Sequence, residues 1–164
     1  KKLTNTMAEQ QKKPFRALVA FENTEIAGAL IDHALRFLDE GDELYLLTVV
    51  EKQLKEDASF IRRQVGKHFD EKIKAKGLKA IDLVLSGDPR KQICEAVIKN
   101  DIEMLFLGDR NHKTSLPGLL LGSATDYCVK HAVCTVVVVK DRTDIMTAAA
   151  EADKKGGLLK KMGL

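Results

Sequence analysis

The chain has 164 residues, of which 45% are apolar and 31% charged, and its formal net charge at pH 7 is +3. This length suits one domain with a real core, and the near-neutral charge gives no reason to expect nucleic acid or a membrane surface as a partner. The longest apolar runs fall far short of the roughly 20 residues that a transmembrane helix needs. No apolar block follows the basic N-terminus, which argues against a secretory signal.

Short apolar runs alternate with stretches of helical period from residue 15 onward. Because these runs lack polar alternation, each is expected to be a strand that is buried on both faces. They are Ala17–Phe21, Leu44–Val50, Ile81–Leu85, Met104–Leu107 and Val133–Val139.

Helix-sized segments separate these runs, and each has an apolar stripe and a recognisable end. The first stripe consists of Ala27, Leu30, Ile31, Ala34 and Leu38, before a break at Gly41-Asp42. The second consists of Ile61, Val65, Phe69 and Ile73, before Gly77. In the third segment Pro89 suits the first helical position, and the stripe is Ile93, Ala96 and Val97. A short helix is expected over Ala124–His131.

Strands separated by helices cannot pair as hairpins, so the sequence predicts an α/β fold with a parallel sheet covered on both faces. One domain is expected over residues 15–141. Residues 1–14 are a polar extension, in which Met7 resembles a natural start and residues 1–6 an expression remnant. Residues 142–164 form a tail, either loosely attached or a short helix.

The three cysteines, Cys94, Cys128 and Cys134, form no CxxC motif. Their odd number and spacing argue against a disulfide framework and a zinc site, and favour a reducing, cytoplasmic setting. Cys94 lies in a helical pattern and is expected to be a small buried residue.

Ligands of open parallel sheets bind beyond the carboxyl ends of the strands. Those ends are Phe21–Glu25, Val49–Glu51 and Gly108–Thr125. In the last segment, Gly108 and the Gly122-Ser123 pair at a helix start suit an anion, because the free N–H groups and the helix dipole favour phosphate. The hydroxyls of Ser123 and Thr125 can add to this site, and so can the charges of Arg110 and Lys113. Alternatively, the glycines only punctuate a loop and Ser123 is an N-cap.

The stretch from Leu119 to Cys128, Leu-Leu-Leu-Gly-Ser-Ala-Thr-Asp-Tyr-Cys, followed by His131–Lys140, resembles the C-terminal signature of universal stress proteins, especially the eukaryotic ones. The resemblance covers residues 15–141. It implies a five-stranded parallel open sheet of order 3-2-1-4-5 with helices on both faces, the adenine nucleotide alpha-hydrolase-like fold.

The family's nucleotide pattern is Gly, two residues, Gly, nine residues, then Gly with Ser or Thr. Gly108 matches its first glycine and Gly122-Ser123 its final pair, whereas Asn111 replaces the second glycine and the spacer is one residue longer. The resemblance implies ATP or AMP as ligand, with or without magnesium. Its adenine would lie between the first two strand ends and its phosphates over Gly108–Ser123.

The nucleotide-binding residues that this resemblance implies are Ala20, Phe21, Glu22, Val49, Leu107, Gly108, Arg110, Asn111, Gly122, Ser123, Ala124 and Thr125. Glu22 stands where the family usually carries an aspartate. The expected function is a binding module of the stress response whose partner interactions depend on the nucleotide, with no catalytic residues and no metal ligands. Three alternatives remain open: a slow ATP hydrolase in which Asp109 positions water and a metal, a dimeric interaction protein without nucleotide, and a flavodoxin-like domain.

The last apolar run is expected to be an edge strand, which is prone to pair with another strand. Antiparallel pairing of two copies about a two-fold axis would close such an assembly, and the family resemblance also implies a homodimer through this strand. The dimer residues are Val136, Val137, Val138 and Val139. The alternative is a monomer whose residues 141–164 cover the edge.

Overall fold

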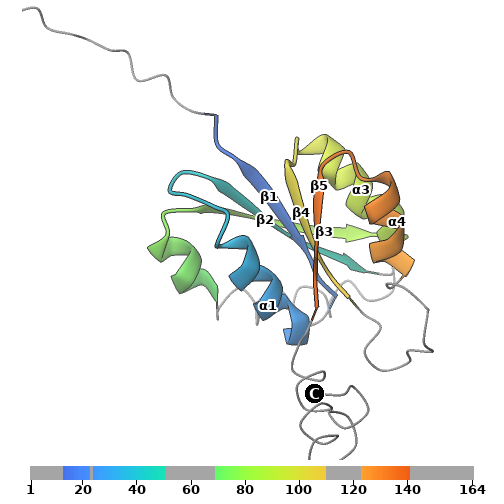
Figure 1. Ribbon diagram of the computed structural model, residues 1–164, viewed down its shortest axis with the longest axis horizontal. Helices are drawn as coiled ribbons and strands as arrows, with labels where there is room; N and C mark the ends of the chain where they lie inside the picture. The colour runs from blue at the N-terminus through green and yellow to red at the C-terminus, as the bar shows by residue number, and fades with distance from the viewer. Residues whose placement is uncertain (1–12, 23, 51–68, 110–122, 141–164) are drawn as a thin grey trace, which may run out of the picture.

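The computed structural model describes residues 13–22, 24–50, 69–109 and 123–140 (Figure 1). The strands are β1 (Arg16–Ala20), β2 (Glu43–Val50), β3 (Lys79–Ser86), β4 (Met104–Gly108) and β5 (Thr135–Val139). The helices are α1 (Thr24–Ala34), α3 (Pro89–Lys99) and α4 (Ser123–His131), and residues 69–75 are also helical. None of the helices in these ranges is long and apolar enough to span a membrane.

The strands form one parallel sheet of order β3-β2-β1-β4-β5, as predicted. β1 lies at its centre, where Ala20 is in register with Leu47 of β2 and with Leu107 of β4. The chain moves outward from β1 through β2 to β3 and then crosses to the other side of β1 to form β4. The strand order therefore reverses between β1 and β4.

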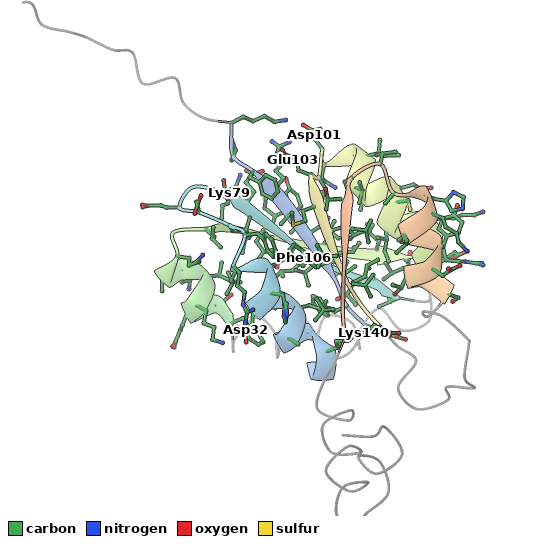
Figure 2. The ribbon with its side chains drawn as sticks, viewed as in Figure 1. Asp32, Lys79, Asp101, Glu103, Phe106 and Lys140 are labelled. Atoms are coloured by element: carbon green, nitrogen blue, oxygen red, sulfur yellow. The ribbon has the colours of Figure 1, made fainter. Side chains whose placement is uncertain are left out.

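Helices cover both faces of the sheet, with α1 on one face and α3 and α4 on the other (Figure 1). Alternate residues of β1 supply both cores: Val19 packs in the cluster of α1, whereas Leu18 packs in the cluster of α3 and α4. Phe106 of β4 is fully buried near the middle of the sheet, and its ring centroid lies 5.8 Å from that of Phe37 (Figure 2). The expected burial on both faces is therefore confirmed for the central strands.

The apolar stripes predicted for the helices are buried wherever the structure describes them. Leu38 is buried although α1 ends at Ala34, because the chain continues across the same core after the helix. At the start of α3, Pro89 takes the first position and the Asp88 side chain accepts a hydrogen bond from the Arg90 N–H at 3.0 Å. This cap fixes where the third crossover helix begins.

The edge strands differ from their predictions. β3 alternates between exposed and partly buried residues because only one neighbouring strand and one helix layer cover it. β5 begins at Thr135 rather than at Val133, whose side chain is 75% exposed. Three predicted features lie outside the described residues. They are the N-terminal extension up to residue 12, the stripe residues Ile61 and Val65, and the tail 142–164.

A charged network joins the amino ends of β1, β2 and β3. The buried Glu43 carboxylate accepts hydrogen bonds from Lys79 at 2.8 Å, Arg16 at 2.9 Å and the Tyr45 hydroxyl at 3.1 Å. The Lys79 bond is the largest influence and lowers the pKa of Glu43 from its ordinary value of 4.5; burial opposes it, and the other two bonds add to it. Because three strands contribute, this network fixes their relative register at the edge opposite the candidate site.

Candidate functional site

The carboxyl ends of β1, β2 and β4 meet at one edge of the sheet, where the strand order reverses. The Phe21 N–H donates to the Leu47 carbonyl at 3.0 Å, so β1 stays paired with β2 one residue beyond its end. On the other side of β1, Ala20 is in register with Leu107 of β4. In open parallel sheets this switch point is where ligands bind.

The start of α4 is attached to the end of β4 by one hydrogen bond. The Thr125 hydroxyl donates to the Gly108 carbonyl at 2.9 Å, and Thr125 is buried. A hydroxyl has a single proton to donate, so this bond differs from the expected role of Thr125 as a side-chain donor to a phosphate. The geometry gives Thr125 a positioning role: it holds the first turn of α4 at the switch point.

Gly108 ends β4 where α1 passes closely. A Cβ at this position would lie 2.4 Å from Cδ1 and 3.1 Å from Cγ1 of Ile26, which is too close for a real contact. The next residue stays in the sheet, because the Asp109 N–H donates to the Val139 carbonyl at 3.0 Å. The sequence-based reason for glycine was the approach of a ligand, whereas the structure supplies a second one, the packing of α1 against β4.

The first turn of α4 presents its backbone to this edge of the sheet. Ser123 is exposed and Ala124 is partly buried, and the first N–H groups of a helix have no partner within the helix. Asp126 pairs with Lys130 at 2.7 Å, one turn further along. The helix dipole and the N–H groups at Ser123 and Ala124, which have no partner within the helix, therefore favour an anion here.

The end of β2 carries a feature that the sequence-based site lacked. The Thr48 side chain is 1% exposed, and its hydroxyl has no hydrogen-bond partner within the described residues. Such a group costs free energy unless it is satisfied. Thr48 is the one polar residue of the run Leu44–Val50, and this property could have marked it as a site residue in the sequence. Its neighbour Val49 is partly buried against the core of α3 and α4.

Three of the predicted site residues turn their side chains into the cores. Ala20 and Leu107 belong to the cluster under α3 and α4, and Phe21 to the cluster under α1. Their contact with a ligand is thereby limited to the backbone. Glu22 is exposed beyond the end of β1. Four further predicted residues lie outside the described ranges, namely Arg110, Asn111, Lys113 and Gly122.

The structure therefore brings together Ala20 to Glu22, Val49, Leu107, Gly108 and Ser123 to Thr125 along one edge of the sheet. Within the described ranges, no three His, Cys, Asp or Glu residues gather as ligands for a metal ion. The fold and the site define an open, parallel α/β protein with an anion-favouring helix start at its switch point.

The amino-acid sequence matches the universal stress protein family over residues 15–140. The chain belongs to this family. Universal stress protein MJ0531 of Methanocaldococcus jannaschii is 26% identical over 143 residues, which span 76% of this chain and 81% of that protein.

Solved universal stress proteins share the fold. One from Arabidopsis thaliana, described with AMP bound, is 23% identical with a TM-score of 0.56, and the match covers 80% of this chain and 94% of that one. Another, in complex with cAMP, is 17% identical with a TM-score of 0.59, over 79% of this chain and 98% of that one. At these identities the likeness establishes the fold and leaves the ligand of this chain to be argued from its own residues.

Proposed function

We propose that this chain is an adenine nucleotide-binding protein of the universal stress protein family, with AMP or ATP as its ligand. The adenine lies between the ends of β1 and β2, and the phosphates lie at the start of α4. One observation carries this proposal: the bond from Thr125 to the Gly108 carbonyl holds the first turn of α4 at the switch point of the sheet. The AMP and cAMP complexes of related proteins agree with this ligand class.

The residues that the structure describes fit an adenine nucleotide. The exposed Ser123 and the first N–H groups of α4 suit a phosphate. The buried ends of β1 and β4 offer backbone groups to a base or ribose. The Thr48 hydroxyl, which lacks a partner among the described residues, lies at the same edge of the sheet. Arg110 and Asn111 remain proposed contacts, and so does the exposed carboxylate of Glu22.

We further propose that the protein acts through binding, as a stress-response module whose interactions with partners depend on the bound nucleotide. The sequence offers no clear general base, which disfavours efficient hydrolysis. Slow ATP hydrolysis is the competing function. A turnover assay with ATP, in the presence and absence of magnesium, separates the two. A rate near the roughly 10 s⁻¹ of a median enzyme would contradict a binding role.

The phosphate position can be tested with Ser123→Asp. An acidic residue in the first turn is compatible with the helix dipole, so the free protein should keep its thermal stability. The same charge repels a phosphate, and we expect AMP affinity to fall at least about tenfold, corresponding to about 1.4 kcal/mol. Ser86→Asp is the matched control, because Ser86 lies at the same carboxyl edge but two strands away from β1.

Adenosine, which lacks the phosphate, distinguishes the base site from the phosphate site. We expect Ser123→Asp to leave adenosine binding unchanged and Ser86→Asp to leave both ligands unchanged, as measured by calorimetric titration. Equal AMP affinity in wild-type protein and Ser123→Asp would contradict the placement of the phosphate at α4.

A further inference from the structure

The three cysteines, which show no motif in the sequence, gather in one layer of the fold. Cys94 lies on α3, Cys128 on α4 and Cys134 just before β5. α3 and α4 pack beside each other on the same face of the sheet (Figure 1). Cys128 is part of the core cluster on that face, and the other two cysteines pack against this cluster. The crossover topology thus concentrates thiols that are far apart along the chain.

Two of these thiols are in direct contact. The Cys94 thiol donates to the Cys128 sulfur, with 4.0 Å between the two Sγ atoms. Cys128 is 0% exposed, whereas Cys94 is partly exposed. Cys134 packs against the same cluster, and the pKa of its thiol is raised, chiefly by burial. The pair has one member that solvent reaches and one that it does not.

We propose that Cys94 and Cys128 are a redox modification site, which a hydroperoxide converts into an intramolecular disulfide between α3 and α4. In the first step the Cys94 sulfur attacks the peroxide oxygen. The O–O bond breaks, Cys94 becomes a sulfenic acid and one water or alcohol leaves. In the second step the Cys128 sulfur attacks the Cys94 sulfur, the S–O bond breaks and a second water leaves with the Cys128 proton. Two thiols are oxidised and one peroxide is reduced.

The different surroundings of the two thiols assign these roles. An oxidant in solution reaches Cys94, because this side chain is partly exposed. Burial is the largest cause that raises the pKa of Cys128, to about 12, so Cys128 stays a neutral thiol at pH 7 and reacts poorly with peroxide itself. Its contact with Cys94 gives it a high effective concentration for the second step. The Cys128 thiol must lose its proton when it attacks the Cys94 sulfur, so disulfide formation should accelerate as pH rises.

Bond formation requires a movement of the two sulfurs. They lie 4.0 Å apart, whereas a disulfide has an S–S distance of about 2.05 Å, so they must approach by about 2 Å. The product would join α4, which Thr125 attaches to the end of β4, covalently to α3. A reducing thiol reverses the reaction by exchange, which makes the site responsive to redox conditions rather than a permanent crosslink.

Peptide mapping tests the proposal, because trypsin separates the three cysteines. Cleavage after lysine places them in the peptides Gln92–Lys99, Thr114–Lys130 and His131–Lys140. The full-length reduced protein is treated with hydrogen peroxide, alkylated under denaturing conditions, digested and analysed by mass spectrometry without reduction. We expect a linked pair of the Cys94 and Cys128 peptides, which disappears after dithiothreitol, while Cys134 remains alkylated.

Single variants identify the partners. Cys94→Ser and Cys128→Ala should each lose the linked pair, and Cys128→Ala should retain Cys94 as a trappable sulfenic acid. Cys134→Ser is the matched control and should form the linked pair as wild type does. Circular dichroism checks the fold of each variant; if Cys128→Ala does not fold, Cys94→Ser, at a partly exposed position, provides the same test. A link through Cys134, a link only between chains, or unlinked oxidation of Cys94 in the wild type would overturn the proposal.

Discussion

The hydrogen bond that attaches α4 to β4 can be removed with little change in shape by Thr125→Val. Thr125 is 5% exposed and its hydroxyl donates to the Gly108 carbonyl at 2.9 Å. A neutral hydrogen bond contributes about 0.5–1.5 kcal/mol, and an acceptor left without a partner raises the cost to about 1–3 kcal/mol. We therefore expect Thr125→Val to lose roughly 1–2 kcal/mol in the free energy of unfolding, toward the lower end because Gly108 is only partly buried.

Urea unfolding followed by circular dichroism measures this loss. With a denaturant slope of about 1–3 kcal/mol per M, the midpoint should fall by roughly 0.3–2 M while the slope is unchanged. AMP affinity should also fall, because the first turn of α4 is no longer held at the switch point. Thr125→Ser keeps the hydroxyl and is the matched control, with the smaller loss. The reasoning is refuted if Thr125→Val is as stable as wild type, or if Thr125→Ser is the less stable of the two variants.

Three further predictions concern the rest of the domain. Because the folded-state pKa of Glu43 is lowered, its contribution to stability is present above its unfolded pKa near 4.5 and is lost as pH falls through the folded value. The stability advantage of wild type over Glu43→Gln in urea unfolding should therefore shrink below pH 4.5; an advantage that grows on acidification would contradict this. Thr48→Val removes a buried hydroxyl without a described partner, so it should raise the free energy of unfolding by up to about 1 kcal/mol without nucleotide, and a clear loss would show that the hydroxyl is satisfied. Finally, β5 is an edge strand of the sheet, and Val137→Lys should shift the homodimer predicted from the sequence toward monomer in light scattering; a wild-type chain that is already monomeric would contradict that dimer.

Most of the fold could be predicted from the sequence because its signals are local. The continuous apolar runs define strands, and Pro89 with Asp88 before it marks the start of α3 within one residue. The edges were predicted less well. Val133 is as apolar as the strand that follows it, and sequence composition alone does not show that it lies outside β5 with its side chain 75% exposed.

The place of the candidate site is a prediction from the parallel topology and from the signature around Gly122-Ser123. The roles of single atoms could not be predicted. The Thr125 hydroxyl was expected to face a ligand, yet it bonds to a carbonyl of β4. Gly108 was expected to admit a ligand, and the structure adds a second reason for glycine, because a Cβ there would lie 2.4 Å from Cδ1 of Ile26 on α1. Both outcomes depend on how a helix packs on a strand, which no spacing along the chain reveals.

The cysteines illustrate the same limit. Their odd number and spacing argue against a disulfide framework and a zinc site, and Cys94 was expected to be a buried hydrophobic residue. The structure leaves Cys94 partly exposed and in contact with Cys128. Two crossover helices on one face of the sheet bring these residues together, and this contact depends on the strand order as well as on the two helices.

Calorimetric titration of the full-length chain with AMP and ATP tests the central claim most directly. The account predicts a saturable heat of binding with one nucleotide per chain. It also predicts that this heat is reduced for Ser123→Asp and retained for Ser86→Asp. No heat for either nucleotide up to millimolar concentration would contradict nucleotide binding and would leave this chain as a family member that acts without it.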